Sequence, residues 1–157
     1  MRYRIREGIA GPDVPHDLVH LVVERETGED GGFWGAVAAG AVFGSMEHVE
    51  GRRPPHARRR SDRALAERGD RLLRAELMAG LVGHVAGHNV TDARRVRVLA
   101  REVLATLPDT SVDAERVIRA GRALRDVSRR WGALETGEEL TLDWPDERGG
   151  RGRPKGR

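Results

Sequence analysis

Two histidines and two carboxylates share the first predicted helix of the chain. Asp17 directly follows His16, His20 comes four residues after His16, and Glu24 follows four residues later. Each step of four residues advances an α-helix by about 400°, so His16, His20 and Glu24 form one stripe along it. Paired histidines at this spacing hold the metal of metalloproteases with a His-Glu-x-x-His helix. The stripe therefore predicts a divalent-metal site, with zinc as the expected ion and His16 and His20 as ligands.

The two carboxylates of the stripe are candidates for catalysis. Asp17 stands where the metalloprotease helix carries its general-base glutamate, although its side chain is one methylene shorter. Glu24 would be a third ligand only if one ion spanned two helical turns. We assign Asp17 and Glu24 as catalytic candidates, with metal-activated water attacking an ester, amide or phosphoester as the reaction class. A solvated helix face is the alternative interpretation of His16, His20 and Glu24.

A second histidine pair, His84 and His88, has the same spacing on a longer predicted helix, with Glu76 and Gly80 in register before it. Three glycines make part of that helix thin, which would let another helix approach closely. If the two helices face each other, all four histidines become metal ligands of one pocket, as in metal-binding helical bundles. His84 and His88 also fall within the apolar arc of their helix, so hydrogen-bonded core histidines are the alternative.

The C-terminal tail resembles an AT-hook, whose Gly-Arg-Pro core lies extended in the minor groove of A·T-rich DNA. A narrow minor groove concentrates negative potential and attracts inserted arginine. The resemblance implies that six tail residues contact nucleic acid: Arg151, Gly152, Arg153, Pro154, Lys155 and Arg157. One hook with about five charges binds weakly at physiological salt. A non-enzymatic module that associates with DNA or with a protein partner is therefore the alternative function.

Composition limits the classes of protein to which the chain can belong. The 157 residues contain no cysteine, which excludes disulfides, thiolate catalysis and cysteine-ligated zinc. No apolar run approaches the roughly 18 residues of a membrane span, and the N-terminus lacks the apolar stretch of a signal peptide, so we expect a cytoplasmic protein. Lys155 is the only lysine among 28 basic residues, a bias typical of GC-rich genomes. Phosphate-binding glycine loops and nucleophile elbows are absent from the sequence.

The spacing of apolar residues predicts the elements that must hold these groups. Alternation over residues 2–6 and 139–144 predicts two strands, which most economically pair with each other because a lone strand is not stable. Helical spacing predicts about five helices, at residues 13–27, 33–42, 61–88, 91–107 and 110–134. Thr91 and Thr110 are the expected N-caps of the last two. With only six aromatic residues, the core must rest mainly on Leu, Val and Ala, which suits packed helices.

The predicted fold class is therefore α+β and predominantly α, with a short pairing of the N- and C-terminal strands. Residues 1–145 are expected to form a single helical domain. Within it, residues 44–61 combine prolines, glycine and arginines without apolar periodicity, which predicts a long basic loop. Residues 146–157 contain nothing to bury and are expected to be a disordered basic tail.

Both ends of the predicted domain resemble a group of small uncharacterised proteins from GC-rich bacteria. The similar segments are residues 15–24 and 32–35 near the start, and Trp131, Leu134 and residues 137–145 near the end. That group has no activity to transfer. The resemblance implies one folded body between the two ends and leaves the chemistry to the residues themselves.

Overall fold

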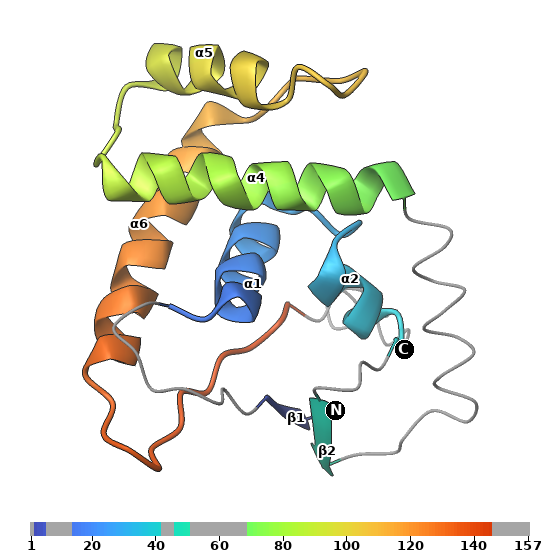
Figure 1. The fold of residues 1–157 in the computed structure, drawn as a ribbon, viewed down its shortest axis with the longest axis vertical. Helices are drawn as coiled ribbons and strands as arrows, with labels where there is room; N and C mark the ends of the chain where they lie inside the picture. The colour runs from blue at the N-terminus through green and yellow to red at the C-terminus, as the bar shows by residue number, and fades with distance from the viewer. Residues whose placement is uncertain (1, 6–13, 42–45, 51–68, 146–157) are drawn as a thin grey trace, which may run out of the picture.

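The computed structural model describes residues 2–5, 14–41, 46–50 and 69–145 of the chain. Within these ranges the protein is mainly helical, as predicted, with five helices and two short strands (Figure 1). The elements in chain order are β1 (Arg2–Ile5), α1 (His16–Thr27), α2 (Phe33–Ala38), β2 (Met46–Glu50), α4 (Gly69–Gly87), α5 (Ala93–Val103) and α6 (Ala114–Gly132). No helix of the described part is long and apolar enough to cross a membrane.

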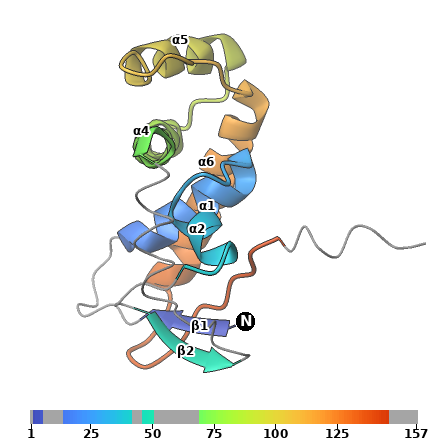
Figure 2. The same cartoon turned by 90° about the vertical axis from the view of Figure 1, so that its right-hand side faces the viewer.

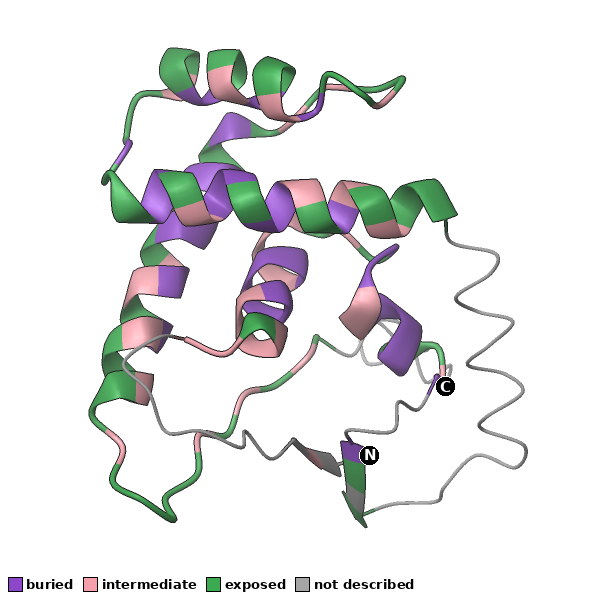
Figure 3. Ribbon diagram, in the orientation of Figure 1, coloured by how far each residue is buried: buried purple, intermediate pink, exposed green. Residues whose placement is uncertain are grey.

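Three helices build the centre of the fold. α1, α4 and α6 each contact the other two, whereas α2 packs on α1 and α5 covers α4 and α6 as an outer layer (Figure 2). The helix faces that meet between α1, α4 and α6 are the buried ones (Figure 3). Val22 and Val23 of α1, Leu81 and Val85 of α4, and Val117 of α6 belong to this core. Every hydrophobic side chain that is buried among the described residues is aliphatic or a methionine, which confirms the expected core composition.

The last two helices begin at aspartates, not at the threonines predicted from the sequence. The Asp92 side chain accepts a hydrogen bond from the Arg94 backbone N–H at 3.0 Å. The Asp113 side chain accepts from the N–H groups of Glu115 and Arg116 at 3.0 and 3.1 Å. Each aspartate thereby satisfies backbone donors that the first turn of a helix leaves without partners. The expected Thr91 and Thr110 caps are therefore wrong by one and three residues.

The predicted pairing of the terminal strands is not confirmed. β1 instead pairs antiparallel with β2, in a register that runs from Arg2 opposite Glu50 to Ile5 opposite Met46. Residues 139–144 form no strand, although Leu140 and Leu142 pack against the core. This segment still approaches β1, because the Arg4 guanidinium Nε lies 2.8 Å from Glu139 Oε1. The expected proximity of the two ends is present at that ion pair, but a backbone ladder is not.

The predicted loop and tail lie largely outside the described residues. Residues 46–50 of the expected 44–61 loop form β2, so the loop prediction is wrong there, and residues 51–61 lie outside the described ranges. Residues 146–157 also lie outside them. The single-domain division at residue 145 and the disordered tail remain predictions.

Candidate metal centre

The N-terminal turn of α1 brings His16 and His20 to the surface of the helix that faces α4. Pro15 precedes the helix, and its carbonyl accepts the N–H groups of Leu18 and Val19 at 2.9 and 3.1 Å. The helix therefore starts at His16, and His20 follows one turn later. The two imidazole rings meet edge to face, with their centroids 4.5 Å apart.

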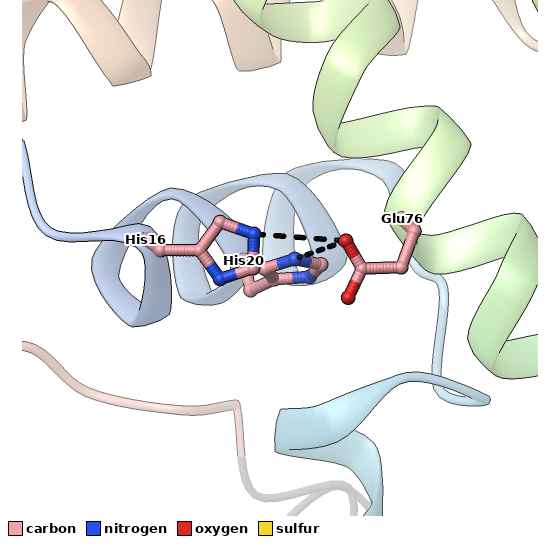
Figure 4. A group of neighbouring side chains, drawn as sticks. All are labelled: His16, His20 and Glu76. Atoms are coloured by element: carbon pink, nitrogen blue, oxygen red, sulfur yellow. Dashed lines mark ion pairs between the residues drawn. The ribbon is translucent and has the colours of Figure 1, made fainter.

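Glu76 of α4 completes a cluster with these histidines. Its Oε2 lies 3.3 Å from His20 Nε2 and 3.6 Å from His16 Nε2, and all three side chains point toward one another (Figure 4). One ligand atom of each residue lies within 4.8 Å of the other two. Bonds of about 2.0–2.1 Å from a tetrahedral zinc ion place neighbouring ligand atoms about 3.3 Å apart. The separation between Glu76 and His20 equals the edge of such a coordination tetrahedron, and the separation between Glu76 and His16 is 0.3 Å longer.

His20 is buried, yet its ring nitrogens make no ordinary hydrogen bond. Its side chain is 5% exposed, and neither Nδ1 nor Nε2 has a hydrogen-bond partner among the described residues. Two carboxylate oxygens lie close to the ring, Glu76 Oε2 at 3.3 Å from Nε2 and Glu24 Oε1 at 3.5 Å from Nδ1. Burial by itself lowers the pKa of His20, but the carboxylates of Glu24 and Glu76 outweigh it and raise that pKa above its usual value. The surroundings of this imidazole therefore favour a bound positive charge.

Glu24 is a buried carboxylate that holds α2 in place. It is 1% exposed, so the prediction of a solvated face is wrong for Glu24 as it is for His20. Its Oε1 accepts the Phe33 N–H at 2.9 Å, and its Oε2 accepts those of Trp34 and Gly35 at 2.9 and 3.1 Å. Glu24 therefore takes the place of an N-cap side chain, which Gly32 at the start of α2 does not have.

Gly32 allows this carboxylate to reach the first turn of α2. A Cβ at residue 32 would lie 2.3 Å from both Cδ and Oε1 of Glu24. No side-chain carbon fits at that distance, so the close approach of the Glu24 carboxylate requires glycine at this position.

Asp17 lies beside the cluster but is not part of it. Its side chain is half-buried and makes no hydrogen bond or ion pair within the described part of the chain. Its backbone carbonyl accepts the indole Nε1–H of Trp34 at 2.8 Å, which ties α2 to the first turn of α1. The general-base role of Asp17 remains a prediction.

The second histidine pair does not join the centre. His84 and His88 are both exposed, and their rings stack with centroids 4.1 Å apart. His88 Nδ1 lies 3.0 Å from the His84 carbonyl oxygen. The interpretation as core histidines is therefore wrong, and the cluster facing α1 takes its α4 contribution from Glu76 instead. In the sequence, Glu76 stands out only as a residue in register with the pair, and it was not predicted as a ligand.

No other candidate group that the structure describes contributes to this cluster. The six AT-hook-like residues lie outside the described part of the chain. A separate cavity of about 380 Å³ lies between the C-terminal end of α1, α4 and the start of α6, and none of the cluster residues lines it. Comparisons of the chain with protein families, with curated proteins and with solved structures find no match.

Proposed function

We propose that this protein binds a divalent transition-metal ion, Zn²⁺ in the first instance, through His16 Nε2, His20 Nε2 and Glu76 Oε2. The observation that carries the proposal is the state of His20. A buried polar group without a hydrogen bond is costly and rare, and this one directs Nε2 toward a carboxylate from another helix at 3.3 Å. A bound cation between these atoms removes that cost.

A shared proton explains the distances less well than a metal ion does. Charge-assisted hydrogen bonds between an imidazolium and a carboxylate are about 2.7–2.9 Å long. Glu76 Oε2 is farther than this from both histidines, at 3.3 and 3.6 Å, and is nearly equidistant from them. Two imidazoles and one carboxylate also form a donor set that zinc accepts in enzymes.

If these three residues hold zinc, a fourth ligand position would stay open to water, as in hydrolytic zinc centres. The His16 and Glu76 side chains are 70% and 58% exposed, so this side of the cluster faces solvent. Zinc lowers the pKa of a bound water to about 7 and polarises a substrate oxygen. Asp17, next to His16, is the proposed general base. The proposed reaction class is hydrolysis of an ester, amide or phosphoester.

Metal content of the purified protein tests the binding proposal directly. The untagged chain is purified without chelators, stripped, reloaded with Zn²⁺ and analysed for bound metal, together with His16→Ala and Glu76→Gln. The double variant His84→Ala/His88→Ala is the matched control, because it removes an exposed pair with the same spacing. We expect about one equivalent in the parent and the control, and a loss of affinity of at least tenfold in the other two. A folded parent that takes up no ion, and gains no thermal stability from Zn²⁺, would refute the proposal.

The reaction class is tested separately on the zinc-loaded protein. A nitrophenyl acetate, a nitrophenyl phosphate and a bis-nitrophenyl phosphate ester probe carboxylester, monoester and diester hydrolysis. We expect one of these activities to vanish with Glu76→Gln, and to fall in Asp17→Asn while the bound zinc is retained. Turnover that is unchanged in Glu76→Gln would show that the activity does not come from this centre.

A further inference from the structure

The two ring nitrogens of His20 face two different carboxylates. Nε2 points toward Glu76 on α4, whereas Nδ1 points toward Glu24, one turn later on α1. The N–H and lone-pair directions of the two nitrogens diverge across the ring, so an atom in line with Nδ1 cannot bind an ion that is held by Nε2. Glu24 therefore lies behind His20 as seen from the cluster and is not a ligand of the same ion.

Within the described part of the chain, the Glu24 carboxylate has one acceptor direction left, and it belongs to the oxygen nearest His20. A carboxylate offers about four lone-pair sites, two on each oxygen. Oε2 uses both of its sites for the N–H groups of Trp34 and Gly35, and Oε1 uses one for Phe33. The remaining site is on Oε1, which is the oxygen 3.5 Å from His20 Nδ1. A ring movement of about 0.5 Å would shorten this contact to a normal hydrogen bond.

We propose that Glu24 is the positioning residue of the metal centre: it accepts the Nδ1–H of His20 and so presents the Nε2 lone pair to the ion. This inference rests on the proposed function. A neutral imidazole carries one proton, and the hydrogen bond at one nitrogen decides which nitrogen is free to bind metal. Metal-bound histidines in proteins almost always donate their other N–H in this way, often to a carboxylate.

Helix α2 is what fixes this carboxylate in position. Three backbone N–H groups of α2 donate to its two oxygens, and the absence of a side chain at Gly32 lets the carboxylate approach them. The indole of Trp34 anchors the same helix to the Asp17 carbonyl, one residue after the first ligand. The six-residue helix α2 thus holds the Glu24 carboxylate in place behind the metal centre, and this carboxylate in turn orients the ring of His20.

The tautomer of His20 in the zinc-loaded parent is the direct test. Long-range ¹H–¹⁵N correlation spectra distinguish a protonated ring nitrogen from a metal-bound one, and His20→Gln identifies the resonances. We expect a protonated Nδ1 and a zinc-bound Nε2. A zinc-bound Nδ1 would overturn the inference while leaving the proposed function intact. A parent that binds no zinc would overturn both, so the two failures are distinguishable.

Affinity measurements on variants give a second test. Glu24→Gln keeps the size of the side chain but replaces one oxygen with a donor, and Glu26→Gln is the matched control on the same helix. Asp113→Ala weakens the fold at the start of α6 without changing α2 or the Glu24 carboxylate. We expect Glu24→Gln to weaken zinc binding by about 10–100-fold and to shift the visible spectrum of the Co²⁺-loaded protein. The two other variants should stay within about threefold of the parent. Equal losses in Glu24→Gln and Asp113→Ala would show that Glu24 acts only by supporting the fold, and would overturn the inference.

Discussion

Replacing Glu24 with alanine removes the shared acceptor of three backbone N–H groups at once. A hydrogen bond to a charged acceptor contributes about 1.5–3 kcal/mol, so three independent bonds would sum to about 4.5–9 kcal/mol. Bonds that share one carboxylate are not additive, and water entering the space would satisfy some of the donors. We therefore expect Glu24→Ala to lower the free energy of unfolding by about 3–5 kcal/mol, a large part of the stability of an ordinary domain.

Urea unfolding followed by circular dichroism, in the presence of a chelator, measures this loss without a contribution from bound metal. With a slope of about 2 kcal/mol per molar urea, the midpoint should fall by about 2 M. Glu26→Ala is the control, because Glu26 pairs with Arg25 in a partly exposed contact of 3.0 Å on the same helix. Such pairs contribute about 0–1 kcal/mol. A Glu24→Ala midpoint indistinguishable from that of Glu26→Ala would refute the assignment of Glu24 as the cap of α2.

Three further predictions follow from the same contacts. Asp113→Ala should cost about 1–2 kcal/mol in urea unfolding, because the N-cap of α6 then leaves two N–H groups without their acceptor; an unchanged midpoint would contradict this cap. Gly32→Ala should destabilise the protein, since its Cβ would lie 2.3 Å from Glu24, whereas Gly80→Ala should raise stability by about 1 kcal/mol, because nothing lies within 4 Å of that Cβ; equal effects would be inconsistent with the structure. The raised pKa of His20 stabilises the metal-free fold fully below its unfolded pKa of about 6.5, and the contribution disappears as pH rises through the folded pKa. Unfolding of the parent and of His20→Gln across this window should therefore converge at high pH, and a difference that grows with pH would contradict the assignment.

Sequence patterns predicted the helices better than the strand pairing. α5 and α6 have strongly amphipathic spacing, so their existence follows from local periodicity. Strand pairing depends on non-local contacts, which periodicity does not report. β2 (Met46–Glu50) has only two apolar residues, Met46 and Val49, so its sequence hardly differs from a polar loop. Residues 139–144 alternate regularly between apolar and polar side chains. Leu140 and Leu142 are nevertheless partly buried against the helical core, without a neighbouring strand.

The difference between local spacing and non-local contacts also explains which parts of the candidate centre could be predicted. His16 and His20 lie on one helix, so their spacing was sufficient to bring them together. Glu76 depends on which turn of α4 crosses α1, and that is a tertiary property. Glu76 and His84 are two turns apart, about 12 Å along the axis. Only one of these turns can therefore approach His16 and His20, and the crossing of α1 and α4 selects Glu76.

A missing cap was the signal that could have identified the role of Glu24. α2 starts at Phe33, and its N-cap residue Gly32 has no side chain that could accept from the first N–H groups of the helix. A helix start without Ser, Thr, Asp or Asn must find acceptors elsewhere. Glu24 lies nine residues before Phe33, on the preceding helix α1, and its carboxylate accepts the first N–H groups of α2.

The choice of a buried carboxylate for this task supports its second role. A serine at the start of α2 would cap the helix without removing a charge from water, and buried charged groups seldom increase net stability over simpler alternatives. Helix capping alone therefore does not explain why the acceptor is a glutamate placed one turn after His20. A carboxylate at this position can accept from α2 and from His20 Nδ1 together, which no residue at position 32 could do. The arrangement is best explained if the orientation of His20 matters to the protein, as it does when Nε2 must bind an ion between α1 and α4.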